Sequence, residues 1–254
     1  MKLIVLGSGT CVPSNHRASP SFLLSLGGST LLFDMGPGTI RQMARIGINH
    51  SHVDRILISH FHPDHSADII HFLFATRIPE ILKNRNPFTV TGPKGLKILI
   101  EDLQRAFKGW LDVPDTLMEI EELDILKPEK RSHREYTLIS QPLRHTSNSL
   151  AYRIQDERGK SLVYSGDTDL CDEIVNLAED CDLLILECSF PEGGEVEGHL
   201  TPSQAGRVAT LAGVHKLLLV HFYPEVLYTD IAKECRRTYR GELVLGRDLL
   251  HILI

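Results

Sequence analysis

Short apolar runs, rich in branched side chains, recur along the 254-residue chain, and they end at residues such as Gly, Pro, Asp or His. Runs of this length between turn-forming residues predict β-strands. The predicted strands cover residues 3–6, 22–26, 30–33, 55–58, 88–91, 136–140, 150–154, 161–164, 183–186, 216–220 and 249–252. Gly27 and Gly28 separate two of these runs, which predicts a β-hairpin at that point.

Helix-length patterns lie between the predicted strands. Pro37 and the pair Thr201 and Pro202 are typical of helix starts, and Gly213 is typical of a helix end. The predicted helices cover residues 37–46, 68–82, 93–107, 169–178, 202–212 and 229–239. The segment 113–134 fits neither pattern clearly. Hairpin-like strand pairs with helices outside them favour an α/β fold of mixed sheets over a doubly wound parallel sheet.

The composition is typical of a soluble globular protein, with 42% hydrophobic and 24% charged residues. It excludes a long disordered chain, collagen and a disulfide-stapled miniprotein, and the length fits a single domain over residues 1–254. The 27 basic and 33 acidic residues give a formal charge of −6. This balance disfavours sequence-independent binding of nucleic acid, which needs Lys and Arg against phosphates, although a local basic patch stays open.

The five cysteines, at positions 11, 171, 181, 188 and 235, form no CxxC pair, and we expect them to be reduced. The first apolar run is too short for a signal peptide. No segment approaches the roughly 20 apolar residues that a membrane span needs. The sequence therefore predicts a cytoplasmic protein with no membrane partner.

Metal-ligating side chains are concentrated where the run 55–58 ends. His60, His62, Asp64 and His65 stand within six residues, and a strand that passes into a turn lets such neighbours converge. Neutral imidazoles and a carboxylate suit zinc, iron or manganese, so the loop predicts a metal site rather than a polar surface loop. The isolated histidines are expected to be surface or structural core residues: His16, His50, His52, His71, His133, His215 and His251.

Three further ligand-type residues follow apolar runs in the same way: His145, Asp167 and His221. Buried strands that end in His or Asp at one edge of a sheet hold such ligands on rigid elements. Any one of the three could be a structural polar residue. Together with the loop at 60–65 they supply seven ligands, the number that two metal ions need if water fills the remaining positions.

These residues resemble the metallo-β-lactamase superfamily, and most closely its ribonuclease Z and phosphodiesterase branch. Residues 60–65 match the HxHxDH signature of that superfamily. The likeness extends over most of the chain, and the other segments that carry it are 1–24, 31–39 (LLFDMGPGT), 92–96 (GPKGL), 145–153 and 198–201 (GHLT). The resemblance implies an αββα sandwich, in which two mixed β-sheets carry helices on their outer faces.

The resemblance also implies two divalent metal ions that share a bridging hydroxide. Zn²⁺ is expected in preference to Mn²⁺ or Fe. Such a pair lowers the pKa of water and clamps the attacking and leaving oxygens of a phosphodiester. By this resemblance, one ion would be held by His60, His62 and His145, and the other by Asp64, His65 and His221. Asp167 would bridge the two ions.

Two residues take catalytic roles by the same resemblance. Asp64 acts in catalysis besides binding metal, and His199 is the candidate proton donor to the leaving oxygen. On the residues alone, His199 could equally be an exposed loop side chain. Asp34 is expected to orient a ligand rather than to bind metal, with a turn-forming role as the alternative.

Asp167 favours phosphodiester hydrolysis, because the lactam-cleaving branch commonly has Cys at the equivalent position. Ribonuclease Z enzymes that grip the tRNA elbow carry a long arm between the segments equivalent to His145 and Asp167, whereas only 21 residues (146–166) separate them here. We therefore expect a small or medium phosphodiester substrate, with RNA cleavage of the ribonuclease Z type as the alternative. An arylsulfatase-type ester hydrolase, a non-catalytic metal-stabilised binding module and a homodimer also stay open.

Overall fold

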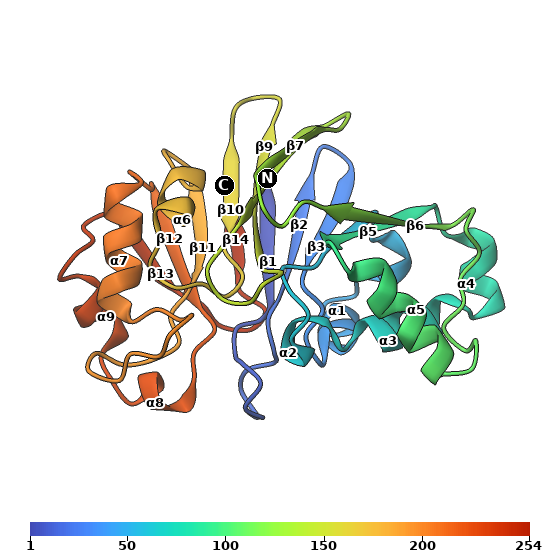
Figure 1. Cartoon of the computed structure of the whole chain (residues 1–254), viewed down its shortest axis with the longest axis horizontal. Coiled ribbons are helices and arrows are strands. Elements are labelled where there is room, and N and C mark those ends of the chain that lie inside the picture. The colour runs from blue at the N-terminus through green and yellow to red at the C-terminus, as the bar shows by residue number, and fades with distance from the viewer.

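The computed structural model describes all 254 residues as two β-sheets packed face to face, with helices outside each sheet (Figure 1). This arrangement is the αββα sandwich that the resemblance to the metallo-β-lactamase superfamily implied. Both sheets are mixed, because each contains three antiparallel and three parallel strand pairs. The two sheets therefore each have an antiparallel and a parallel half.

The first sheet has the strand order β14-β1-β2-β3-β4-β5-β6. Its strands are β1 Lys2–Gly7, β2 Ser21–Leu26, β3 Ser29–Phe33, β4 Arg55–Leu57, β5 Phe88–Pro93, β6 Met118–Leu123 and β14 His251–Leu253. The second sheet has the order β13-β12-β11-β10-β9-β8-β7. Its strands are β7 Glu129–Ser132, β8 Tyr136–Pro142, β9 Leu150–Asp156, β10 Ser161–Tyr164, β11 Leu183–Glu187, β12 Lys216–Val220 and β13 Glu242–Leu245.

The helices divide between the outer faces of the two sheets (Figure 1). The first half of the chain contributes α1 Thr39–Arg45, α2 Pro63–Ser66, α3 Ile69–Thr76, α4 Pro79–Asn84, α5 Leu96–Ala106 and the short 3-10 helix η1 His50–His52. The second half contributes α6 Asp172–Leu177, α7 Pro202–Leu211, α8 Pro224–Leu227 and α9 Ile231–Cys235. None of the helices combines the length and apolar character that crossing a membrane would require.

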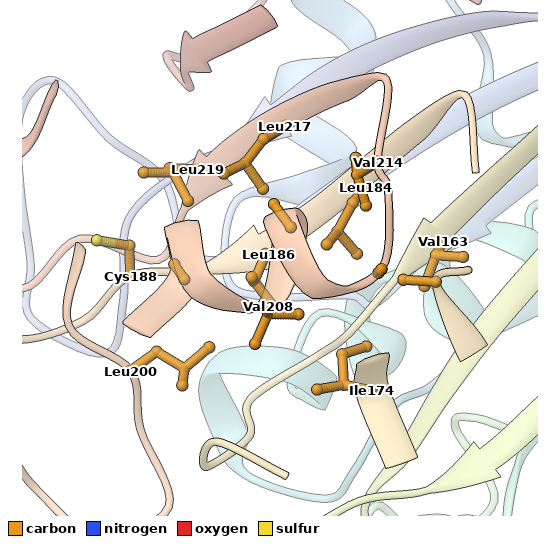
Figure 2. Close-up of a cluster of buried hydrophobic side chains, with 14 of the residues drawn as sticks. Val163, Ile174, Leu184, Leu186, Cys188, Leu200, Val208, Val214, Leu217 and Leu219 are labelled. Atoms are coloured by element: carbon orange, nitrogen blue, oxygen red, sulfur yellow. The ribbon is translucent and has the colours of Figure 1, made fainter. Parts of the chain in front are cut away.

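The central strands of the sandwich bury both of their faces, and β11 shows how alternation produces this. Leu183 and Ile185 point into the cluster between the sheets, while Leu184 and Leu186 join the cluster beneath the helices. Figure 2 shows Leu184 and Leu186 close to Val208 of α7. The side chains of β11 therefore pack against the first sheet on one face and against the outer helices on the other.

The structure corrects the predicted elements at several places, and it adds the unpredicted strand β13. The predicted helix 68–82 is two helices, α3 and α4, because Pro79 lacks the backbone N–H that a continuous helix needs and Ile78 before it is extended. The unassigned segment 113–134 contains β6 and β7. The last strand begins at His251 rather than at residue 249, since Leu249 has a φ of 61° and cannot extend the strand.

We predict that Leu186→Ala lowers the free energy of unfolding by about 2–5 kcal/mol, because it leaves a cavity between β11 and α7. Leu186 has no exposed surface, whereas Leu211, in the last turn of α7, is 61% exposed. Leu211→Ala is therefore the matched control and should change stability by less than about 0.5 kcal/mol. Urea denaturation measures both, and equal effects of the two substitutions would contradict this description of the core.

Candidate metal centre

The predicted ligands all follow strands that end at one edge of the sandwich. His60 to His65 follow β4 and run into α2, whose first residue is Pro63. His145 follows β8, Asp167 follows β10 and His221 follows β12. The structure brings all seven predicted metal ligands together, in groups whose ligand atoms lie within 4.8 Å of one another.

Asp167 lies between two sets of imidazoles. Its Oδ2 atom is 3.8 Å from His60 Nε2 and 3.7 Å from His145 Nε2. Its Oδ1 atom is 3.3 Å from His65 Nε2 and 3.5 Å from His221 Nε2. Each carboxylate oxygen therefore faces a different group of ligands, which is the arrangement that a bridging carboxylate requires.

The remaining contacts complete the two groups. On the Oδ2 side, His62 Nδ1 is 3.2 Å from His145 Nε2. On the Oδ1 side, Asp64 Oδ2 is 3.6 Å from His221 Nε2, which in turn lies 3.4 Å from His65 Nε2. The first group thus consists of three imidazoles and the second of two imidazoles and a carboxylate, with Asp167 shared.

The donor atoms of this cluster fit divalent metal ions. A tetrahedral site with bonds of about 2.0–2.1 Å has donor atoms about 3.3 Å apart, close to the separations between these side chains. His60 Nε2 and Asp167 Oδ1 are buried without any hydrogen-bond partner. Buried polar atoms without partners are costly, and a cation in each ligand group would satisfy both atoms.

Hydrogen bonds at Nδ1 orient four of the five ligand imidazoles. The partners are Ser59 Oγ for His60 at 3.0 Å, Asp34 Oδ2 for His65 at 2.7 Å, the Gly198 carbonyl for His145 at 2.9 Å and Ser189 Oγ for His221 at 2.8 Å. An imidazole held at one ring nitrogen presents the other as a ligand, so these four rings offer Nε2. His62 differs, because its Nδ1 atom faces the cluster.

Asp34 supports this arrangement from the end of β3. Besides His65, its carboxylate accepts hydrogen bonds from the Ser59 backbone N–H at 2.6 Å, the Ser59 hydroxyl at 2.7 Å and the Tyr164 hydroxyl at 2.5 Å. These contacts place Asp34 against His65, as the prediction that Asp34 orients a ligand requires. Asp34 and His221 both have left-handed backbones, with φ of 54° and 58°, so the surrounding contacts hold them in a costly conformation.

Burial sets the protonation of the first ligand group. It lowers the pKa of His60 well below its ordinary value, and the neighbouring His65 adds to the effect. Burial also lowers the pKa of His145. Both rings are therefore neutral near neutral pH, which is the state in which imidazole binds metal.

A positive charge is favoured at the second ligand group. Burial opposes the ionisation of Asp167, yet His221 and His65 hold its pKa well below the usual range. Burial likewise opposes a charge on His65, but Asp167 and Asp34 raise the pKa of this ring well above its ordinary value. A ring flanked by two carboxylates attracts a cation at Nε2, either a proton or a metal ion.

His199 lies beside both ligand groups, with ring centroids 4.9 Å from His145 and 5.8 Å from His221. Its Nδ1 atom is 2.9 Å from Oε1 of Glu187, a carboxylate that is 1% exposed. Burial acts against the charged ring, but the hydrogen bond and charge of Glu187 raise the pKa of His199. His199 is therefore held in place by a buried carboxylate and is not a free loop side chain.

Sequence reasoning missed Glu187, although the same signal that found the ligands was present. Glu187 is the last residue of β11, an otherwise apolar strand, just as His221 follows the apolar strand β12. Its carboxylate also accepts hydrogen bonds from the backbone N–H groups of Thr168 at 2.9 Å and Leu200 at 3.2 Å. It thereby joins the loops that carry Asp167 and His199.

The isolated histidines lie outside the metal cluster, as predicted. His50 is buried against Phe72, with ring centroids 5.4 Å apart, and His133 packs on Tyr136 at 4.7 Å. The others are exposed on the surface: His16, His52, His71, His215 and His251.

The fold and the His and Asp cluster together define a metal-binding protein. Residues 29–222 match the family described as the Beta-lactamase superfamily domain. Ribonuclease Z from Streptomyces avermitilis is 31% identical over 294 aligned positions, which cover 99% of this chain and 97% of the relative. The chain therefore belongs to the β-lactamase superfamily and is a metal-dependent hydrolase, whose His and Asp cluster binds divalent metal.

Solved structures show the same fold over the whole length. The metallo-beta-lactamase fold protein YhfI from Bacillus subtilis has a TM-score of 0.85 at 24% identity and covers 99% of both chains. The short form of human tRNase Z has a TM-score of 0.80 at 23% identity, covering 100% of this chain and 99% of that one. These two similarities confirm the metallo-β-lactamase fold.

We predict that Asp34→Asn weakens metal binding by about 10–100-fold, because an amide cannot accept all four hydrogen bonds and His65 loses its anchor. Competition with a chromogenic chelator measures the dissociation constants. Asp54→Asn is the control, since Asp54 lies just before β4, at the opposite end of that strand from the metal loop, and accepts a hydrogen bond from the Thr30 backbone N–H. Unchanged metal affinity in Asp34→Asn would contradict the orienting role.

Proposed function

We propose that this chain is a phosphodiesterase that uses two divalent metal ions, Zn²⁺ in preference to Mn²⁺ or Fe, and that residues 1–254 form one hydrolase domain. The observation that carries the proposal is the placement of Asp167, whose two oxygens face separate ligand groups. His60, His62 and His145 would hold one ion, and Asp64, His65 and His221 the other. A homodimer and a cytoplasmic location stay predictions.

Bound divalent ions would supply Lewis acidity, which neutralises charge on phosphate oxygens and makes water a nucleophile near neutral pH. The chain's own residues prepare the site for that chemistry. The rings of His60 and His65 are buried, whereas His62 is exposed, so substrate has an open approach from the side of His62. Asp64, at the start of α2, places a carboxylate beside His221. Besides binding metal, Asp64 would take the catalytic role predicted for it.

His199 would protonate the leaving oxygen. With Nδ1 donating to Glu187, the protonated ring carries a second hydrogen on Nε2, and the raised pKa of His199 favours that state. A general acid must hold a proton near the operating pH and reach the leaving atom. Glu187 then acts as a positioning residue, which fixes the ring and stabilises its charge.

The substrate that we favour is a small or medium phosphodiester, such as a cyclic nucleotide. The segment between His145 and Asp167 supports this choice, because it contains β9, a tight turn and β10, with no long arm. The second candidate function is RNA cleavage of the ribonuclease Z type. The 31% identity to a ribonuclease Z along nearly the whole chain favours it.

Turnover of bis(p-nitrophenyl) phosphate by metal-replete protein tests the proposed function. We expect metal-dependent release of p-nitrophenolate, and we expect Asp64→Ala to lower kcat by about 10²-fold or more, since it removes a predicted ligand. Asp68→Ala is the control, because Asp68 caps α1 through the Ile40 N–H and lies outside the ligand groups. No metal-dependent turnover by the wild type would favour a non-catalytic binding module instead.

Precursor tRNA and cyclic nucleotides, compared at one fixed salt concentration, separate the two candidate substrates. We expect a higher kcat/KM for the cyclic nucleotides. Efficient cleavage of the precursor at its mature 3′ end would instead establish the ribonuclease Z reaction and overturn our preference.

We predict that His199→Ala lowers kcat by about 10²-fold or more while metal content is unchanged, because only the proton donor is lost. Glu187→Gln should give a smaller loss and shift the basic limb of the pH–rate profile to lower pH, since the carboxylate no longer raises the pKa of His199. Glu195→Gln, in the exposed part of the same loop, is the control. Loss of metal from His199→Ala would refute the proton-donor role.

A further inference from the structure

An aromatic pair, Phe190 and Tyr223, lies at the rim of the metal centre. The two rings are stacked, with centroids 4.7 Å apart and an interplanar angle of 21°. Phe190 lies just after β11 and Tyr223 just after β12, and these two strands are neighbours in the second sheet (Figure 1). Both side chains are half-buried, and neither belongs to a hydrophobic core cluster. Core packing therefore does not account for the pair.

The aromatic pair borders the ring that would protonate the leaving oxygen. The His199 centroid is 5.5 Å from Phe190 and 6.1 Å from Tyr223, with interplanar angles of 67° and 71°. Tyr223 also meets the ligand His221 edge to face, at 5.6 Å and 74°. The rings of His199 and His221 are nearly parallel, at 12°. The pair thus forms a wall that stands steeply against both imidazoles.

The backbone holds both rings of this wall in place. Phe190 and Tyr223 each precede a proline, which restricts a residue to extended conformations, and Tyr223 has φ −71° and ψ 157°. The Phe190 N–H donates to the Leu200 carbonyl at 3.3 Å, and the Tyr223 hydroxyl lies 3.3 Å from Cys11 Sγ. A surface that is ordered before a ligand arrives loses little entropy when it binds.

The loop 189–201, which carries Phe190 and His199, is acidic. It contains Glu192, Glu195 and Glu197 and no Lys or Arg, and the last two of these glutamates are exposed. Carboxylates repel a nearby phosphate, whereas the faces of aromatic rings pack well against a planar group. This side of the metal centre therefore suits an uncharged planar group and disfavours an additional phosphate.

We infer that Phe190 and Tyr223 are specificity-determining residues that pack against the base of a nucleoside on the leaving side of the scissile phosphate. The inference rests on the proposed phosphodiesterase function, with His199 as its proton donor. The leaving oxygen must lie next to His199, so the group attached to that oxygen reaches the aromatic pair. In a nucleoside 2′,3′-cyclic phosphate, water adds to phosphorus and one ribose oxygen leaves and takes the proton, which gives a nucleoside monophosphate.

Steady-state kinetics of metal-replete protein with two matched substrates tests this inference. The substrates are adenosine 2′,3′-cyclic phosphate and its analogue in which hydrogen replaces the base. Phe190→Leu and Tyr223→Leu should each raise KM for the adenosine substrate about 5–10-fold with little change in kcat, because a base loses a stacking partner. Both constants for the analogue should stay near the wild-type values, since it has no base to pack. Tyr223→Phe keeps the ring and should keep the wild-type KM.

Phe107→Leu is the matched control and should change neither substrate's constants, because Phe107 lies just after α5, outside the other sheet, and is 42% exposed. Equal losses on both substrates in the Phe190 and Tyr223 variants would show a general structural role and overturn the inference. Wild-type KM values in both leucine variants would overturn it too, as would turnover of bis(p-nitrophenyl) phosphate without turnover of the adenosine substrate. No turnover of any of the three compounds would refute the proposed function and the inference with it.

Discussion

The carboxylate of Asp167 is the one group that both halves of the metal centre share. It is 3% exposed, and four imidazole nitrogens lie within 3.8 Å of its two oxygens. A buried anion is stable only when positive charge or hydrogen-bond donors compensate it, and Oδ1 has no hydrogen-bond partner. Cations in the spaces on both sides of this carboxylate would supply that compensation.

Packing of the two sheets fixes the ligands at the distances that such cations need. Tyr164 of β10 in the second sheet donates to Asp34, which follows β3 in the first sheet. Tyr152 of β9 likewise donates to the Ile58 carbonyl, next to the metal loop, at 2.6 Å. A Cβ on Gly166, before Asp167, would lie 2.7 Å from Ser59 Cβ, so the two loops meet without room for a side chain. Packing between the two sheets therefore determines the geometry of the metal centre.

Local signals predicted the mixed sheets with outer helices and the ligand cluster, and the resemblance to the metallo-β-lactamase superfamily supplied the αββα sandwich. Apolar runs that end in His or Asp identified the strands and placed their terminal side chains at one edge. The strands that were missed, β6, β7 and β13, are edge strands. β6 and β7 have mostly polar positions, so no apolar run identified them, whereas β13 contains a short apolar run of three residues, 243–245, that was not assigned. Glu187 was missed for a different reason, since its role depends on contact with His199, a loop residue that no strand pattern positions.

The metal content of purified, metal-replete protein tests the central claim most directly. Inductively coupled plasma mass spectrometry of the wild type should find two ions per chain, and Asp167→Ala should lose tight binding at both positions together, because each ion shares that carboxylate. A wild-type protein with one ion or none would contradict the account, as would an Asp167→Ala protein that keeps two tightly bound ions.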